Sequence, residues 1–528
     1  MNYVIGSGPT GVACAWMLLK KGLPVTMLDV GFQLENNRKD VVRAIRSRDP
    51  QEWDDEILKD YKSGFEVHAK GVKYKTSYGS LFPYKDAALY KSHYRDVSLH
   101  SSYARGGLSN VWGASIATYD GEDLQGWPIS LTELKTYYDK VLSFMPISKA
   151  SSVSMISGRL GAAQFRELKM SRQIQALNTR MVNLKTHPDH PAVSLGGSCL
   201  AVGHTHERRD PKECIYCGLC MYGCPFSLIY NSAVTLNALK AHQNFEYRGG
   251  IFVESLRESG GEVQIKIRDL TSGRNLLLRG DRVFIGAGVF STARIMLSSC
   301  EEYDQPLVCQ DSQYFLLPLL GLWGCRGVAD EDLHTLAQLC LQVKQPGRKR
   351  AAFLQIYGYN DLYLQAIKSL TGYAYPVLKG VAHFFLDRLF LVQAFFHSDI
   401  SHKIKIELKK NADGMDELYF EGLRTDAAKK ALRDVMAKTH SYFRRLKVFT
   451  LDPLMDPGLP GRGYHSGGTF PMKTSPTHRE TDLVGRPHGF RRVHLIDASV
   501  FPTIPAGPIT FSAMANAARI ADQHGQNP

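Results

Sequence analysis

Residues 1–29, MNYVIGSGPTGVACAWMLLKKGLPVTMLD, decide the fold. The apolar residues 2–5 predict a buried strand, residues 10–21 a helix with small and apolar side chains on one side, and residues 24–28 a second strand. A loop of the pattern G-x-G-x-x-G joins the first strand to the helix. A strand, a glycine loop, a helix and a strand that ends at an acidic residue predict a parallel, Rossmann-like dinucleotide-binding unit.

The glycines of this loop have different physical tasks. Gly6 permits the tight turn, Gly8 lets the backbone approach a pyrophosphate, and Gly11 lets the helix pack closely on the strand. The helix N-terminus offers free N–H groups and a positive dipole to the phosphates. Asp29 is expected to accept hydrogen bonds from ribose hydroxyls. The loop alone does not separate FAD from NAD, but its place near residue 1 is typical of proteins that keep FAD bound.

Several later segments share glycine-rich or small-residue turns next to predicted strands and helices. They are residues 105–114 (RGGLSNVWGA), 283–288 (VFIGAG) before a helix over 291–298, 464–469 (YHSGGT), 495–502 (LIDASVFP) and an alanine-rich helix over 511–523. In this order they resemble the glucose–methanol–choline (GMC) oxidoreductases. Within that family the chain is similar to bacterial flavin dehydrogenases that act on sugars and related polyols, including iron–sulfur-containing ones.

The resemblance implies that FAD lies extended across the nucleotide-binding domain. Its diphosphate would meet the glycine loop, its adenine the strand 251–256, and its flavin ring the 105–114 and 497–510 segments. The residues that the resemblance assigns to the cofactor are Gly6, Gly8, Pro9, Thr10, Gly11, Asp29, Arg105, Gly107, Ser109, Asn110, Trp112, Gly113, Ala114, Val253, Ala287, Gly288, Asp497, Ala498, Ile509 and Thr510.

The resemblance also makes His465 the catalytic base that faces the flavin. Alcohol oxidation removes the hydroxyl proton while a hydride leaves the same carbon, and a histidine pKa near 6.5 suits that proton transfer at neutral pH. One position departs from the family pattern: Pro508 stands where relatives offer a second histidine or an asparagine. Proline has no side-chain donor or acceptor. His397 and His402 are candidate replacements, although surface or core positions explain most such histidines.

Four cysteines form the pattern C-x2-C-x2-C-x3-C-P. This is the spacing with which bacterial ferredoxins wrap an iron–sulfur cluster, and zinc is the first alternative, followed by free thiols. Because there is no second run, the cluster could be [4Fe-4S] or, with three ligands, [3Fe-4S]. The candidate ligands are Cys214, Cys217, Cys220 and Cys224, with Cys199 as a further candidate.

We expect an α/β fold with an inserted domain. A Rossmann-like FAD-binding domain would comprise residues 1–309 and 455–528, with a cysteine-rich loop at about 196–228. Residues 310–454 would form an α+β substrate-binding or cap domain on an antiparallel sheet, with strands in 391–408 and 418–420 and a helix from 425 or 426 to about 446.

Composition limits the partners. The 528 residues include 64 lysines and arginines against 51 acidic residues, which suits anionic partners, but no nucleic-acid-binding motif is found. With no secretory signal or membrane-spanning run, we expect a cytoplasmic protein, with peripheral contact to the inner membrane surface. The aromatic and leucine-rich stretch 363–396 fits either a buried helix pair or a hydrophobic lip that admits a lipid-linked substrate.

The sequence therefore predicts an FAD-dependent dehydrogenase. It would oxidise an alcohol of a sugar or sugar conjugate, lipid-linked or free, pass a hydride to FAD, and release electrons through the cluster to an acceptor protein or quinone. Two alternatives stay open. One is an oxygen-using alcohol oxidase whose cysteines bind a structural metal, and the other is a non-catalytic electron-transfer subunit, which Pro508 motivates.

Overall fold

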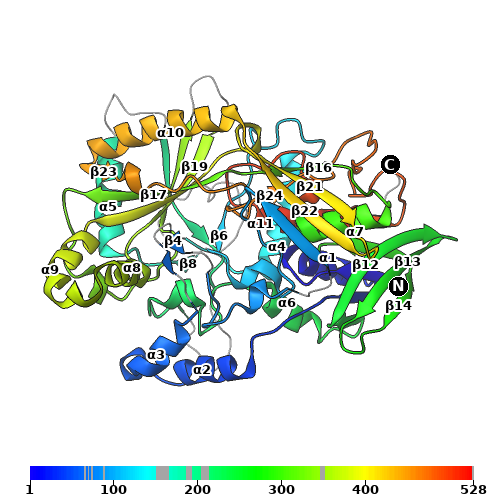
Figure 1. Ribbon diagram of the computed structural model, residues 1–528, viewed down its shortest axis with the longest axis horizontal. Helices are drawn as coiled ribbons and strands as arrows, with labels where there is room; N and C mark the ends of the chain where they lie inside the picture. The colour runs from blue at the N-terminus through cyan, green and yellow to red at the C-terminus, as the bar shows by residue number, and fades with distance from the viewer. Residues whose placement is uncertain are drawn as a thin grey trace.

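The computed structural model describes residues 1–64, 67–68, 71–72, 75–86, 90–149, 166–185, 193–203, 213–344 and 351–525. Part of the predicted cysteine-rich loop, residues 204–212, lies outside the described residues. Within the described chain, a parallel sheet lies toward one end of the molecule and a large antiparallel sheet toward the other (Figure 1). The predicted α/β fold class is confirmed.

The parallel sheet has the strand order β11-β2-β1-β15-β25. β1 lies in the middle and is buried on both faces, which explains why its sequence is a continuous run without alternation. It pairs with a strand far along the chain, since Asn2 lies opposite Arg282. The strands are β1 (Asn2–Ile5), β2 (Val25–Leu28), β11 (Phe245–Arg248), β15 (Arg282–Ile285) and β25 (Val493–Leu495).

Helices and a second small sheet surround these strands. The predicted helices are confirmed to within two residues: α1 is Pro9–Lys20, α7 is Val289–Ser299 and α11 is Thr510–Gln523. α1 packs directly against α11, which joins the two ends of the chain, and α11 also contacts α4 (Leu131–Leu142). The antiparallel strands β12 (Ile251–Ser259), β13 (Glu262–Asp269) and β14 (Asn275–Gly280) extend beside the parallel sheet.

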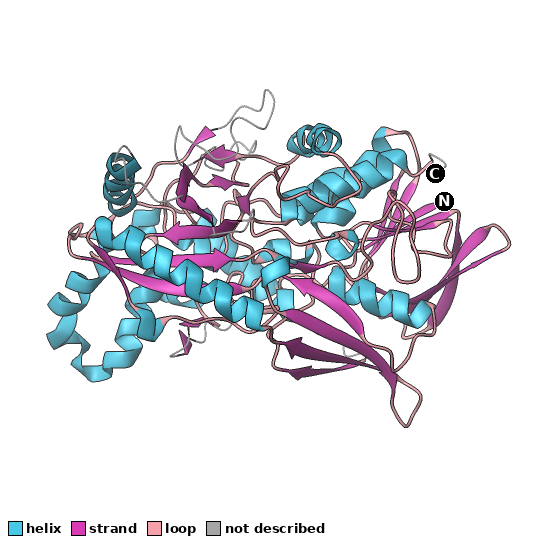
Figure 2. Cartoon of the chain, turned by 90° about the horizontal axis from the view of Figure 1, so that it is seen from above, coloured by secondary structure: helices cyan, strands magenta, loops and turns pink. Residues whose placement is uncertain are grey.

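A six-stranded antiparallel sheet forms the other end. Its order is β23-β17-β20-β19-β18-β9, with bounds Val448–Thr450, Tyr314–Gly321, Leu389–Phe395, Ala351–Tyr357, Leu339–Lys344 and Val193–Gly197. Side chains of one face, such as Phe315 and Phe390, pack with α5 (Arg172–Lys185) and α10 (Asp426–Arg445), which lies across the sheet in Figure 2. Thr425 caps α10 as predicted, because its side chain accepts a hydrogen bond from the N–H of Ala428.

A mixed sheet connects the two ends. Its order is β24-β16-β21-β22-β5, with bounds Ser466–Gly467, Leu307–Asp311, Lys403–Lys410, Asp416–Leu423 and Lys91–Arg95. Apolar residues of β21 and β22, such as Ile406 and Phe420, belong to the same core as the parallel sheet. The predicted segment boundaries therefore differ from the packing: α5 and β9, from before residue 310, join the six-stranded sheet, while β21 and β22, from within 310–454, pack on the nucleotide-binding core.

Shorter elements complete the fold. α2 (Asn36–Arg46), α3 (Asp55–Tyr61) and α6 (Ser232–Leu239) lie near the cysteines. Two small sheets are formed by β6 (Ser115–Ile116), β10 (Cys199–Leu200), β7 (Ser148–Lys149) and β8 (Arg166–Glu167), and by β3 (Val67–His68) and β4 (Gly71–Val72).

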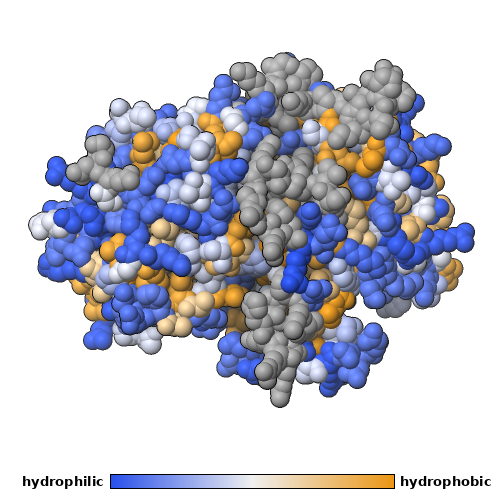
Figure 3. Space-filling view, turned by 180° about the vertical axis from the view of Figure 1, so that it is seen from behind, coloured by the Kyte–Doolittle hydropathy of each residue, from blue (hydrophilic) through white to orange (hydrophobic). Residues whose placement is uncertain are grey.

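The aromatic and leucine-rich stretch 363–396, for which two interpretations were open, forms most of α8 (Asp361–Thr371), all of α9 (Tyr375–Leu386) and the buried strand β20. The two helices form a hairpin at the edge of the molecule (Figure 1). The pair is not buried: within α9, only Ala382 and Leu386 are buried. The face seen in Figure 3 is mainly hydrophilic with scattered hydrophobic residues. None of the helices in the described residues combines the length and the apolar character needed to cross a bilayer.

Candidate active site

A cavity of about 1620 Å³ lies between the carboxyl ends of the parallel strands and one face of the six-stranded sheet. Ligands of open α/β sheets bind at the carboxyl ends of their strands. A pocket for one drug-sized molecule measures roughly 300–1,000 Å³, so this cavity has room for a dinucleotide and a substrate together. The residues that line it come from both halves of the fold, from Ile5 and Leu28 on one side to Leu391 and Gln393 on the other.

The glycine loop is shaped for close approach. Gly6 has a φ of +94°, and a Cβ there would lie 2.6 Å from the backbone oxygen of Gly286. A Cβ on Gly11 would lie 1.9 Å from the oxygen of Gly6, so only glycine lets α1 begin this close to β1. A Cβ on Gly8 would meet nothing within 4 Å, because this side of the loop faces the cavity. The loop therefore presents open backbone at the helix N-terminus, as a diphosphate requires.

Asp29, at the end of β2, is held in place by two donors. Its carboxylate accepts hydrogen bonds from Ser7 Oγ and, at 3.0 Å, from the Tyr247 hydroxyl. Burial raises the pKa of Asp29 to about 6, and these hydrogen bonds oppose that rise. Ser7 Oγ also accepts a hydrogen bond from the N–H of Gly106, at 2.9 Å, so the two glycine segments are joined at this point. Sequence reasoning did not identify Ser7 or Tyr247.

The 105–114 turn is stabilised by its own side chains. Asn110 donates to the backbone oxygens of Arg105 and Gly107 at 3.1 and 2.7 Å, and Trp112 Nε1 donates to the oxygen of Tyr230 at 2.8 Å. Four of the predicted cofactor residues do not line the cavity, although they belong to the segments that form its wall: Gly11, Arg105, Asn110 and Ala114. The others do line it, namely Gly6, Gly8, Pro9, Thr10, Asp29, Gly107, Ser109, Trp112, Gly113, Val253, Ala287, Gly288, Asp497, Ala498, Ile509 and Thr510.

Asp497 connects two of the predicted segments. Its carboxylate accepts hydrogen bonds from the N–H of Gly288 at 3.0 Å, from Thr292 Oγ1 at 2.5 Å and from the N–H of Ser499 at 3.0 Å. Burial raises the pKa of Asp497, and the hydroxyl and backbone donors oppose the rise. The side chain thus fixes the wall beside the beginning of α11, where Ile509 and Thr510 meet the cavity.

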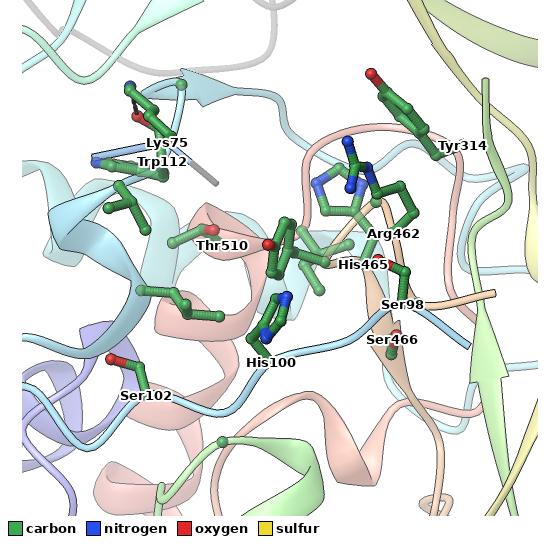
Figure 4. Close-up of a pocket in the computed structure, with 18 of the residues that line it drawn as sticks. Lys75, Ser98, His100, Ser102, Trp112, Tyr314, Arg462, His465, Ser466 and Thr510 are labelled. Atoms are coloured by element: carbon green, nitrogen blue, oxygen red, sulfur yellow. Dashed lines mark hydrogen bonds between the residues drawn. The ribbon is translucent and has the colours of Figure 1, made fainter. Parts of the chain in front are cut away.

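His465 lies on the opposite side of the cavity from Lys75 and Trp112, with Thr510 and His100 between them (Figure 4). Burial lowers the pKa of His465 to about 4, so its ring is uncharged at neutral pH. The ring stacks on Phe395, with centroids 4.6 Å apart. Its Nδ1 is buried, and no described residue forms a hydrogen bond with it. A buried polar atom of this kind normally has a partner, which here would be a ligand in the cavity.

A group of polar side chains that sequence reasoning missed lies on the cavity face of the six-stranded sheet. The Tyr357 hydroxyl donates to Gln355 Oε1 at 3.0 Å and to Gln393 Oε1 at 3.1 Å. Gln355 and Gln393 are directly opposite each other on β19 and β20. Tyr357 also approaches the 105–114 turn, since a Cβ on Gly113 would lie 3.6 Å from its hydroxyl. The available signal was weak: Gln355 and Tyr357 lie two residues apart in the otherwise apolar β19, and Gln393 is the only polar residue of β20.

The structure distinguishes between the two candidate replacements for the missing second catalytic residue. Pro508 does line the cavity, where the family pattern expects a polar side chain. His402 lines it too, and its Nδ1 accepts a hydrogen bond from the N–H of Thr425 at 3.0 Å. His397 does not line the cavity, and its Nδ1 accepts from the N–H of Asp399 at 3.1 Å. Of the two predicted alternatives, only His402 is at the cavity.

The four cysteines of the C-x2-C-x2-C-x3-C run lie near one another, around the short 3-10 helix Leu219–Tyr222. Burial raises the pKa of the Cys214, Cys217 and Cys224 thiols, the nearness of the Cys220 sulfur raises each further, and backbone N–H groups oppose the rise. Cys199 is placed elsewhere: it is part of β10, beside Cys340. In the described part of the chain, no three His, Cys, Asp or Glu side chains are arranged to hold a metal ion.

A second, small hollow of about 180 Å³ separates the cysteines from the main cavity. Cys220 and Cys224 line it on one side. Lys75, Ser109 and Trp112 line both this hollow and the main cavity. Lys75 Nζ donates to the backbone oxygen of Trp112 at 2.9 Å, and burial lowers the pKa of Lys75 to about 8. Two of the cysteines and residues of the 105–114 turn therefore line the same hollow.

Comparison with known families gives a match in the region that holds His465, Asp497 and Thr510. Residues 405–517 match the family described as GMC oxidoreductase. This stretch is similar to the C-terminal domain of the GMC oxidoreductases. The prediction of an oxidoreductase that acts on CH–OH groups is supported by this match.

Among solved structures, the fold is similar to pyridoxine 4-oxidase from Mesorbium loti, with a TM-score of 0.57. That comparison covers 100% of this chain and 99% of the other, at 13% sequence identity, so it concerns the fold. A comparison with curated proteins gives no match. The stretch that matches the GMC oxidoreductases and the parallel sheet thus both contribute to the wall of one cavity.

Proposed function

We propose that the protein is an FAD-dependent dehydrogenase that oxidises an alcohol group of a sugar or sugar conjugate. The observation that carries the proposal is His465: an uncharged, buried imidazole with an Nδ1 that no described residue pairs, in a cavity large enough for a dinucleotide and a substrate. The match of residues 405–517 to the GMC oxidoreductases supports the same assignment.

The residues at the parallel sheet suit FAD. The open backbone of the glycine loop would bind the diphosphate, Asp29 the adenosine ribose, and Val253 the adenine. Trp112, Gly113 and Thr510 would line the flavin ring. When bound, FAD supplies a hydride acceptor at that ring.

The protein side chains would manage the proton and the orientation of the alcohol. His465 would accept the hydroxyl proton at a ring nitrogen as the hydride leaves the carbon. Because its ring is already uncharged at neutral pH, no prior deprotonation is needed. Gln355, Gln393 and Tyr357 would bind further hydroxyls of the substrate, since amide and phenol groups both donate and accept. Several such groups on one wall favour a polyhydroxylated substrate over a simple alcohol.

We further propose that the cysteine run binds an iron–sulfur cluster, [4Fe-4S] or [3Fe-4S], through which electrons leave for an acceptor protein or quinone. Two observations support this: the ferredoxin-type spacing, and the position of Cys220 and Cys224 on the same small hollow as Ser109 and Trp112 of the 105–114 turn. Backbone N–H groups directed at three of the sulfurs are also typical of thiolate ligands. A bound cation would oppose both causes of the raised pKa values of these thiols, first burial and then the nearness of the other sulfurs.

Anaerobic purification with measurement of FAD, iron, acid-labile sulfide and zinc per chain tests the cofactor assignments. We expect one FAD, and iron and sulfide in cluster stoichiometry. Sugars and polyols are then screened for bleaching of the flavin absorbance without oxygen. Absence of flavin in a protected preparation would refute the whole proposal, whereas zinc without sulfide would refute the cluster alone.

The alternative is an oxygen-using alcohol oxidase with a structural metal at the cysteines. The observation that favours it is the similarity of the fold to an enzyme named as an oxidase, pyridoxine 4-oxidase. Turnover with dyes but not with oxygen supports the dehydrogenase. Rapid reoxidation of the reduced flavin by oxygen supports the oxidase. The non-catalytic electron-transfer subunit, which Pro508 motivates, would be favoured if dithionite reduces the flavin but none of the alcohols does.

A further inference from the structure

The helical hairpin α8–α9 has an exposed apolar end that the proposed chemistry does not use. We define this apolar tip as the exposed large hydrophobic residues of the hairpin: Leu370, Tyr373, Val377, Leu378, Val381, Phe384 and Phe385. Tyr373 is fully exposed, and Val377 and Leu370 are 87% and 79% exposed. Contiguous apolar groups of this kind on a protein surface mark interaction sites.

The base of the hairpin is held by hydrogen bonds and by apolar packing. The exposure of its tip therefore belongs to the folded structure and does not result from a detached hairpin. Asp361, at the start of α8, accepts hydrogen bonds from Lys62 and Tyr222 at 2.7 and 2.9 Å. Leu386, at the end of α9, is buried in a cluster with Val328 and Leu333. Between these anchors the two helices project at one end of the molecule (Figures 1 and 2).

Beyond its first residue, Asp361, which is paired with Lys62 at the base, the charged side chains of the hairpin are lysines, and Asp387 follows the end of α9. Residues 362–386 contain Lys368 and Lys379 and no aspartate or glutamate. Both lysines are exposed, and Arg388 follows with its guanidinium 3.6 Å from the centroid of the Phe384 ring. Apolar and aromatic groups flanked by cations are the composition of segments that lie in a membrane interface, with the cations at the level of the anionic headgroups.

The main cavity reaches the same hairpin. Tyr363, Ala366, Ser369 and Leu370 of α8 line it, and Leu370 is also exposed at the tip. From there toward His465 the wall carries apolar side chains of the six-stranded sheet and its neighbours, namely Leu316, Pro318, Leu389, Leu391 and Leu432. Leu370 thus belongs both to the cavity wall and to the apolar tip, so an apolar portion of a ligand can extend from one to the other.

We propose that the apolar tip docks on an anionic lipid bilayer, with Lys368 and Lys379 at the headgroups and the cavity opening at the membrane surface. The complementary charge is the reason for choosing a bilayer over a second copy of this chain, which carries the same two lysines and a formal net charge of +13. If the proposed function holds, the alcohol substrate carries an apolar portion that stays in the bilayer while its polar end reaches His465. Docking itself does not depend on that function.

Flotation of the full-length FAD-loaded protein with vesicles tests the proposal. We expect it to float with phosphatidylcholine vesicles that contain phosphatidylglycerol, and weakly with phosphatidylcholine alone. The double variant Val377→Glu/Val381→Glu should lower the partition coefficient on the order of a hundredfold, since it places charges where apolar groups insert. Lys368→Ala and Lys379→Ala should each lower it about fivefold, with a reduced salt dependence.

A matched control comes from the far end of the molecule. Leu277 on β14 is 53% exposed, and Leu277→Glu should leave flotation unchanged. In a Val377→Trp variant, the fluorescence of the added tryptophan should shift to shorter wavelength when anionic vesicles are present. This shift reports insertion of the tip in a variant that adds no charge to it.

Equal flotation of the wild type and the double Glu variant would overturn the proposal. So would a dimer in light scattering that the double variant dissociates, because a second copy would then cover the tip. Alcohol oxidation is measured separately, with soluble sugars and without vesicles or detergent. The flotation result can therefore be interpreted even if no sugar is oxidised.

Discussion

The charge state of His465 can be tested quantitatively. Burial lowers its pKa to about 4, against an ordinary value of about 6.5. At pH 6, a histidine with a pKa of about 4 is about 99% uncharged, whereas one with a pKa of about 6.5 is about 24% uncharged. If His465 is the base, the rate of flavin reduction at low substrate concentration should change by less than about a tenth between pH 8 and pH 6, instead of falling about fourfold.

The assay is anaerobic stopped-flow bleaching of the flavin with a sugar that reduces it. A His465→Ala variant should retain FAD and lose about 10²–10⁴ in this rate. A second readout needs no substrate: the ring signals of His465 in labelled protein, assigned by their absence in the variant, should show no titration above about pH 5. A rate that declines with an apparent pKa near 6.5, together with ring signals that titrate there, would refute the assignment of a buried, uncharged base.

The same pKa has a consequence for stability. Because the unfolded chain binds a proton on His465 near pH 6.5 and the folded chain only near pH 4, stability is lost as pH falls through this window. The full loss is about 3 kcal/mol, the shift multiplied by about 1.4 kcal/mol per unit. The difference in unfolding free energy between the wild type and His465→Ala should therefore move by about this amount, in favour of the variant, between pH 7 and pH 4. An unchanged difference would mean that the ring is solvated.

Three substitutions test other parts of the site. Gly11→Ala should yield protein with little flavin absorbance per chain, because its Cβ would lie 1.9 Å from the Gly6 oxygen; full flavin content would contradict the loop geometry. Tyr247→Phe removes one of two side-chain donors to Asp29, so the affinity of the apoprotein for FAD, followed by fluorescence titration, should fall about fivefold to tenfold, and an unchanged affinity would separate Asp29 from the cofactor. Phe390→Ala, in the fully buried face of the six-stranded sheet, should lower the unfolding free energy in urea by about 3–5 kcal/mol, and a loss under 1 kcal/mol would show a loosely packed core.

The nucleotide-binding half could be predicted from the sequence because its signals are local. The strand, glycine loop and helix at residues 2–20 are each specified by neighbours in the chain, and α1 begins one residue from its predicted start. The cap of α10 by Thr425 is a local hydrogen bond and was likewise predictable. Thus turns and helix caps can be predicted from the sequence where a residue determines the conformation or hydrogen bonding of the neighbouring backbone.

The rest of the fold depends on pairings that no local pattern specifies. β9 (Val193–Gly197) completes a sheet whose next strand begins at Leu339, and β5 (Lys91–Arg95) pairs with β22 more than 300 residues later. For the same reason the segment boundaries at 310 and 454 do not follow the packing. Gln355 and Gln393 were missed because their role depends on which face of β19 and β20 meets the cavity, and the strand sequences alone do not state that. The α8–α9 sequence did not distinguish burial from exposure, since apolar helices occur in both.

β1 is synthesised long before β15, the strand that lies beside it in the parallel sheet. Ribosomes add roughly 5–20 residues per second, so β1 would emerge about 14–56 seconds before Arg282 is made to pair with it. β25 and α11, which complete the wall around Asp497 and Thr510, come about 200 residues later still. During this interval the apolar strands β1 and β2 are exposed edges that invite chaperones or misassembly. Productive cofactor loading therefore belongs to the end of translation, and a nascent chain stalled before residue 490 would be a client of the quality-control machinery and not a partially active flavoprotein.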